Sequence, residues 1–129
     1  MLQPGLKAER RMTVGPEDTA ESVGSGTLPV LATPRMIALV EATASAAVAS
    51  DLEPGTSSVG TLVNVAHTSA TPVGMDVVCA AELIEVDRRR LVFRVEVSDA
   101  SGPIGSGIHE RFVVDDAKFM SKARSKLGA

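Results

Sequence analysis

Glu41 is the carboxylate of this sequence with the clearest potential for acid–base chemistry. On a helix it lies four residues after Ile37 and three before Ala44, among uncharged neighbours on the apolar side. Inside a fold, a carboxylate costs several kcal/mol unless it is paired or hydrogen-bonded. Two interpretations stay open: a carboxylate held inside the fold for chemistry, or one at the edge of the helix, in water.

The two histidines, His67 and His109, supply groups that titrate near neutral pH. His67 ends the run Val63, Val65, His67 on one face of a predicted strand, and His109 shares a strand face with Arg111. A lone histidine in such a place is more often a packed core or rim residue than a catalyst. By itself, neither histidine indicates catalysis.

Thr33 and Gly60 each have a structural explanation. Thr33 precedes Pro34 and is predicted to cap a helix, because proline suits the first helical position. Gly60 lies inside a predicted strand, where glycine often marks a bulge or a close backbone approach by a ligand. The GPIGSG segment at 102–107 lies between two strands and is therefore not a phosphate-binding loop, and no GxSxG motif indicates an α/β-hydrolase.

The elements that must position these residues follow from the hydrophobic periodicity. A first strand is predicted at 6–14, and Gly, Ser, Thr and Pro make 15–29 a long loop of the kind that serves as a lid or binding loop. A helix opens at Thr33 and Pro34 and is stopped at 53–55; four strands follow at 57–70, 75–86, 91–98 and 104–114, then an amphipathic helix at 115–127. The apolar side of the first helix comprises Met36, Ile37, Val40, Ala44, Ala47 and Val48.

The last strand and the last helix each have two predicted faces. In the strand, Ile104, Ile108, Phe112 and Val114 share the apolar face, and His109 and Arg111 lie on the other. In the helix, the apolar stripe comprises Phe119, Met120, Ala123 and Leu127, and the basic stripe Lys118, Lys122 and Lys126.

The predicted fold class is α+β, with an antiparallel sheet wrapped around one long central helix and a further helix at the C-terminus. Residues 1–129 form a single domain in this interpretation. One central helix cannot easily cover both faces of such a sheet, so a second subunit is expected.

Composition excludes several classes of function. Only 2% of the 129 residues are aromatic (Phe93, Phe112 and Phe119), which excludes a base-stacking RNA surface, and a net charge of −3 argues against nucleic-acid binding. One cysteine, Cys79, excludes an intrachain disulfide, and with two histidines it leaves too few ligands for a structural zinc site. Neither a secretion signal nor a membrane-spanning segment is predicted, so a cytoplasmic protein is expected.

Two segments, EPGTSSVGTLVNVAHTSATPVGMDV (53–77) and GSGIHERFVVDDAKF (105–119), resemble the thioesterase family typified by fluoroacetyl-CoA thioesterase. The likeness covers residues 27–119, and its specific parts are VGT…V.HT.ATP.G and GSG.HER. It implies the hot-dog fold and hydrolysis of a small acyl-CoA to the free acid and CoA, with no cofactor or metal because CoA belongs to the substrate. It also implies a homodimer, with sheets joined edge to edge and active sites near the subunit interface; a dimer of dimers is the alternative.

The resemblance also implies roles for five residues. In that family a Thr at the start of the central helix, a Glu eight residues later and a His in the second strand form the catalytic set, which Thr33, Glu41 and His67 match. Glu41 would act as base or nucleophile, His67 as proton shuttle and polarising donor, and Thr33 would orient Glu41 or the acyl group. Gly60 matches the glycine that approaches the thioester carbonyl, and Arg111 matches an arginine close to the substrate.

The lid segment departs from the family pattern. The fluoroacetyl-specific enzyme has aromatic residues upstream of its catalytic Thr, whereas AESVGSGTLPVLA (20–32) has none, so a broader or different small acyl group is expected. A hot-dog protein that binds an acyl-CoA or related small ligand without turnover is the first rival, and the retained Thr33, Glu41 and His67 argue against it. A hydratase is the second rival, and the absence of an Asp near His67, apart from Asp76 beyond the turn, argues against that one.

Overall fold

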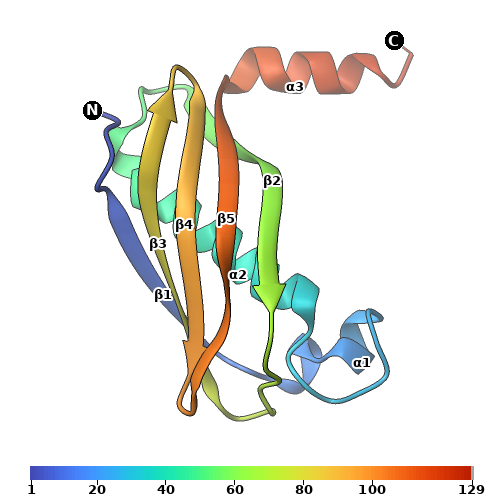
Figure 1. Ribbon diagram of the computed structural model, residues 1–129. Coiled ribbons are helices and arrows are strands. Elements are labelled where there is room, and N and C mark those ends of the chain that lie inside the picture. The colour runs from blue at the N-terminus through green and yellow to red at the C-terminus, as the bar shows by residue number, and fades with distance from the viewer. Residues whose placement is uncertain (129) are drawn as a thin grey trace.

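A five-stranded antiparallel sheet curves around one long helix (Figure 1). In the computed structural model, which describes residues 1–128, the strand order is β1-β3-β4-β5-β2, so β1 and β2 are the edges. The strands are β1 (Lys7–Thr13), β2 (Thr56–His67), β3 (Asp76–Asp87), β4 (Arg90–Asp99) and β5 (Gly102–Asp115). The predicted α+β architecture is confirmed.

The central helix α2 (Thr33–Val48) lies on the inner face of the sheet and forms the core with it. Of the predicted apolar positions, Ile37 is partly buried, and those fully packed against the sheet are Met36, Val40, Ala44, Ala47 and Val48. The helix ends before the predicted stop, and a 3-10 turn, η2 (Ala49–Asp51), follows it. Ser50 and Asp51 favour this early end, because their short polar side chains compete with helical backbone hydrogen bonds.

The predicted faces of β5 are wrong. His109 is fully buried and Arg111 nearly so, on the side of the sheet that packs on α2, whereas Phe112 is exposed on the outer side. A bulge explains the difference: Val97 pairs with Gly105 and Ser98 with Pro103, which leaves Ile104 as an extra residue. Ile104 is buried, and beyond it the inner positions are the odd-numbered ones, so the alternation shifts by one residue.

The segment before α2 is more structured than the predicted loop. It contains a 3-10 turn, η1 (Pro16–Asp18), and a one-turn helix, α1 (Ala20–Val23), whose N-cap Thr19 accepts a hydrogen bond from the Ser22 N–H. Asp18 is buried and pairs with Arg35 of α2 at 2.9 Å, so the segment is fastened to the start of the central helix.

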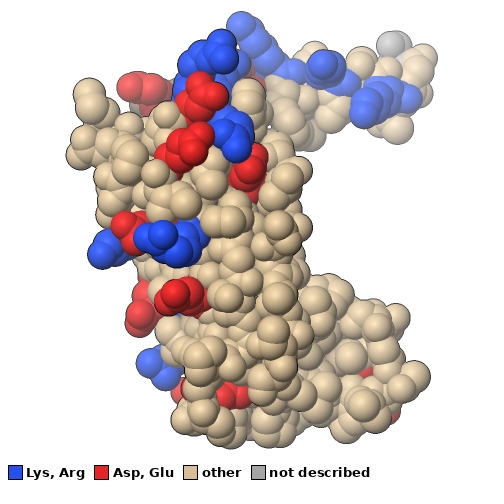
Figure 2. All heavy atoms as spheres, viewed as in Figure 1, with Lys and Arg blue, Asp and Glu red and all other residues tan. Residues whose placement is uncertain are grey.

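The C-terminal helix α3 (Asp116–Ser125) is confirmed, but none of its residues is buried. It leaves the end of β5 and extends away from the sheet (Figure 1), with Phe119 and Met120 each 42% exposed. Lys and Arg side chains gather along α3 and at the neighbouring end of the sheet (Figure 2). Among residues 1–128, no helix has the length and apolar character needed to cross a membrane.

Candidate active site

Thr33 and His67 meet at the N-terminal end of α2. The prediction that Thr33 caps this helix is wrong: Ala32 is the N-cap residue, without a side-chain cap, and Thr33 is already helical. The Thr33 Oγ1 atom lies 2.7 Å from His67 Nδ1 at the end of β2. The hydroxyl is therefore engaged with the imidazole rather than with the helix backbone.

A cavity of about 330 Å³ opens beside this pair. Its wall comes from α1 and the loop after it, from the start of α2 and from the end of β2: Ala20, Ser25, Val30, Leu31, Thr33, His67, Thr68, Ser69 and Ala70. Burial lowers the pKa of His67, an effect that a hydrogen bond with the Ser69 backbone partly offsets. The imidazole is therefore neutral at pH 7, and its buried Nε2 has no hydrogen-bond partner among the described residues.

Glu41 lies two turns further along α2, beside Arg111 of β5. The Glu41 Oε2 atom is 3.7 Å from Arg111 Nη1, and the side chains are 44% and 8% exposed, respectively. Arg111 is fixed by Ser58 of β2, donating from Nε to the hydroxyl and from Nη2 to the carbonyl oxygen, each at 2.8 Å. Of the two interpretations of Glu41, the structure supports the second in part: the carboxylate is at the margin of the apolar side, with one face toward solvent and one toward a buried guanidinium.

Gly60 gives the Glu41 carboxylate room to approach the backbone. A Cβ atom at Gly60 would collide with Glu41 Oε2 and lie 3.3 Å from His109 Cε1. The β2–β5 register also shifts between Gly60 and Leu62, which marks a bulge at Thr61. The bulge therefore lies next to Gly60, and the group that comes close to the Gly60 backbone is the Glu41 side chain.

Within one chain, these residues form two separate groups. Thr33 contacts His67, and Glu41 contacts Arg111 beside Gly60, but no hydrogen bond or ion pair joins the two groups. Thr33 and Glu41 are eight residues apart, about 12 Å along a helix. Gly60 and His67 are seven residues apart, over about 20 Å along a strand.

His109 belongs to the second group and was not among the predicted site residues. Its Nε2 atom lies 3.2 Å from Arg111 Nη1, and its Nδ1 atom lies 2.8 Å from the Leu62 carbonyl oxygen. One signal in the sequence pointed to it, because His109 and Arg111 are predicted to share a strand face. That face was predicted to lie opposite the apolar one, whereas in the structure it is the face that packs on α2.

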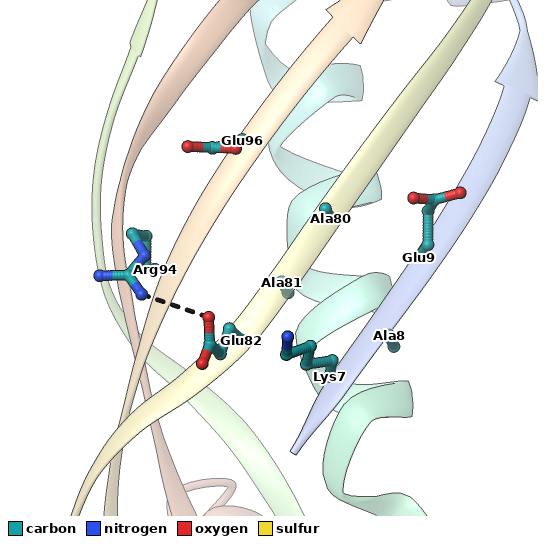
Figure 3. Close-up of a pocket in the computed structure, with 8 residues that line it drawn as sticks. All are labelled: Lys7, Ala8, Glu9, Ala80, Ala81, Glu82, Arg94 and Glu96. Carbon is teal, nitrogen blue, oxygen red and sulfur yellow. Dashed lines mark hydrogen bonds and ion pairs between the residues drawn. The ribbon is translucent and has the colours of Figure 1, made fainter. Parts of the chain in front are cut away.

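Another hollow, of about 410 Å³, lies on the outer face of the sheet above Ala80 and Ala81 (Figure 3). Charged side chains surround it, and Arg94 pairs with Glu82 at 3.2 Å across neighbouring strands. None of the five predicted site residues lines it. The hollow arises where the small side chain of Ala80 lies among long charged neighbours.

The two groups together contain the kinds of side chain that acid–base chemistry on an activated acyl group uses. They contain a neutral imidazole bonded to a hydroxyl, a carboxylate beside a guanidinium, and a strand backbone left open by glycine. Between residues 1 and 128, no group of three or more His, Cys, Asp or Glu side chains is placed to hold a metal ion.

Comparisons with known proteins agree with this chemistry. A family model described as fluoroacetyl-CoA-specific thioesterase matches residues 14–117. The fluoroacetyl-CoA thioesterase of Streptantibioticus cattleyicolor is 47% identical over 100 residues, which cover 78% of this chain and 72% of that protein. A solved structure of fluoroacetyl-CoA thioesterase superposes with a TM-score of 0.92 at 39% identity over 98% of each chain.

A more distant structure points to the same fold. A thioesterase superfamily member from Thermus thermophilus superposes with a TM-score of 0.91 at 27% identity, covering 99% of this chain and 95% of the other. With a family match over most of its length, this chain belongs to the fluoroacetyl-CoA-specific thioesterase family and is a thioester hydrolase of the hot-dog fold.

Proposed function

We propose that this protein hydrolyses a short-chain or other small acyl-CoA thioester to the free acid and CoA, with Thr33, Glu41 and His67 as its catalytic set. The observation that carries the proposal is the pairing of Thr33 with a neutral, half-buried His67 in the wall of a cavity. A neutral imidazole near pH 7 can both accept and donate a proton, as thioester hydrolysis requires.

In the proposed reaction Glu41 and His67 move the protons, the Gly60 N–H binds the oxyanion, and Thr33 orients His67 through its hydrogen bond. Glu41 takes a proton from water, whose oxygen adds to the thioester carbon while the carbonyl electrons move onto its oxygen. The Gly60 N–H stabilises that oxyanion. The proton on Glu41 then passes to His67, the C–S bond breaks as the carbonyl re-forms, and the protonated His67 delivers that proton to the leaving sulfur. In the nucleophilic variant, the Glu41 carboxylate adds to the thioester carbon, the C–S bond breaks and CoA leaves as a thiol after it takes up a proton. Water then hydrolyses the resulting anhydride to the free acid and the Glu41 carboxylate.

The separation of the two groups supports a homodimer as the active form. The 12-residue strand β2 pairs with β5 on one side only, so its outer edge is open to a partner, and its Leu62 and Val63 are 44% and 41% exposed. Two copies of β2 that pair antiparallel run in opposite directions, so a register centred between Val63 and Asn64 would place Gly60 of one strand opposite His67 of the other. Each site would then combine Glu41 and Gly60 of one chain with Thr33 and His67 of its partner.

The residues that line the cavity favour the proposal that the substrates include small acyl groups other than fluoroacetyl. The relatives are named for fluoroacetyl-CoA. Here the lid residues that face the cavity are Ala20, Ser25 and Val30, without an aromatic side chain. We therefore propose a broader selection among short acyl chains.

A thiol-release assay tests this function. Acetyl-, propionyl-, butyryl- and fluoroacetyl-CoA are compared with wild-type protein, Glu41→Gln and His67→Ala, with the exposed Glu53→Gln as matched control. We expect kcat to fall by about 10²- to 10⁴-fold in the two site variants and to stay unchanged in the control. Near-wild-type rates in both site variants would overturn the catalytic assignment, and binding of CoA without any turnover would favour the non-catalytic acyl-CoA-binding alternative.

A further inference from the structure

His109 is a fully buried histidine with both ring nitrogens engaged. Nδ1 lies 2.8 Å from the Leu62 carbonyl oxygen, and because a carbonyl only accepts, Nδ1 carries the hydrogen and donates it. Nε2 then has a free lone pair, which accepts from Arg111 Nη1–H at 3.2 Å. The two partners therefore define a single neutral tautomer, and burial lowers the pKa of His109, which keeps it in that form.

The Nε2 side of the ring controls the guanidinium that faces Glu41. Arg111 donates to the Ser58 hydroxyl and carbonyl through Nε and Nη2, so its Nη1 is the group left to face both His109 Nε2 and Glu41 Oε2. Without His109, that end of the guanidinium would lose its neutral acceptor. The direction in which Arg111 presents its charge to Glu41 therefore depends on His109.

The Nδ1 side of the ring controls the backbone next to Gly60. The Leu62 carbonyl follows the bulge at Thr61, where the ladder between β2 and β5 is interrupted. Besides His109, the Thr61 hydroxyl holds this bulge by donating to the Glu110 carbonyl at 3.2 Å. The hydrogen bond from His109 to Leu62 thus fixes the strand within two residues of Gly60.

We propose that His109 is a positioning residue of the active site, one imidazole that sets both the Arg111–Glu41 pair and the backbone at Gly60. The proposal rests on the proposed function, in which Glu41 and Gly60 act on the thioester. His109 does not act on the substrate itself, because it has no exposed surface and both nitrogens are occupied. Phe93 of β4, stacked on the ring with centroids 6.3 Å apart, holds it in place without a polar contact.

Two conservative variants separate the two hydrogen bonds. In His109→Asn, the amide nitrogen can replace Nδ1 and donate to Leu62, but no acceptor remains for Arg111. In His109→Gln, the amide oxygen can replace Nε2 and accept from Arg111, but the donor to Leu62 is lost. His109→Ala loses both bonds, and Phe93→Leu is the matched control that loosens the packing around the ring while the hydrogen bonds remain.

The experiment measures kcat and KM for the best acyl-CoA, together with the thermal midpoint of each variant. We expect His109→Ala to lose at least about 30-fold in kcat, with KM changed by less than about threefold. The Asn and Gln variants should each recover part of that loss, while Phe93→Leu lowers the midpoint and keeps kcat within about threefold.

Two different outcomes are distinguishable. If the wild type turns over but the three His109 variants lose no more kcat than Phe93→Leu at a similar midpoint, the positioning role is wrong and His109 is only a packed polar residue. If the wild type turns over no acyl-CoA, the proposed function fails, and the role of His109 fails with it.

Discussion

The Thr33 hydroxyl has a different role in the structure from the one that the sequence predicts. A Thr before Pro predicts a helix cap, yet the helix begins one residue earlier and the hydroxyl bonds His67. The two roles predict different consequences for the same substitution, so they can be separated experimentally.

Replacing Thr33 by Val keeps the shape and removes the hydroxyl, whereas Ser keeps the hydroxyl. We expect Thr33→Val to lose about tenfold or more in kcat and Thr33→Ser to stay within a few-fold. Thermal unfolding provides the check on the cap: a lost cap would cost about 1 kcal/mol, and because Thr33 makes no cap we expect no such loss. A Val variant that is destabilised by that amount but fully active would restore the cap interpretation.

The two histidines predict how stability depends on pH. Burial lowers the pKa of His67 and of His109 below the ordinary value of 6.5, so the unfolded chain takes up protons at higher pH than the folded one. The free energy of unfolding therefore falls as the pH drops below about 6.5 and levels off below the folded pKa values. Urea unfolding at pH 7.5, 6.5 and 5.5 measures this, and His109→Gln should show a smaller fall than wild type. An equal fall in both proteins would mean that His109 contributes nothing to it.

The family resemblance, and not the residue types, assigns Thr33, Gly60 and His67 to a site, because each of them also has a structural explanation. Glu41 stands out already from its uncharged neighbours on the helix. The contacts that distinguish these explanations, such as the Glu41 carboxylate above Gly60, join residues far apart in the sequence. No local pattern encodes them. His109 was missed for a different reason, the bulge in β5.

At the scale of elements, one bulge determines which side chains of β5 point toward the helix. Alternation counted from Ile104 places His109 and Arg111 outside, but the extra residue at Ile104 reverses every later position. A pattern of alternating residues does not show where a bulge inserts an extra residue that pairs with none in the neighbouring strand. The helix α2, by contrast, was predictable in place and face, because its apolar period is long and uninterrupted.

The C-terminal helix α3 is predicted to contribute little to the stability of the fold. None of its residues is buried, so removing it after Asp115 takes little apolar surface from the core. We expect the truncated chain to unfold within about 3 °C of the full chain, as measured by circular dichroism. A much larger loss would indicate that the apolar side of α3 is covered in the folded assembly.

At the scale of the whole molecule, the edge strand β2 is the surface on which the proposed dimer depends. Val63→Lys places a charge on this strand, and Val73→Lys places one at a similarly exposed valine in the β2–β3 turn. We expect only the first to sediment as a monomer and to lose activity. Monomeric behaviour of both variants, or of neither, would contradict an interface at β2.

The most direct test of a catalytic site shared between two chains mixes two inactive proteins. If each site takes Glu41 from one chain and His67 from the other, a dimer of one Glu41→Gln chain and one His67→Ala chain contains one intact site and one doubly altered site. Half of a randomly mixed population is such a dimer, so the mixture should regain about one quarter of wild-type activity per chain. Activity that stays at the level of the two parent variants after subunit exchange would contradict a catalytic site assembled from two chains.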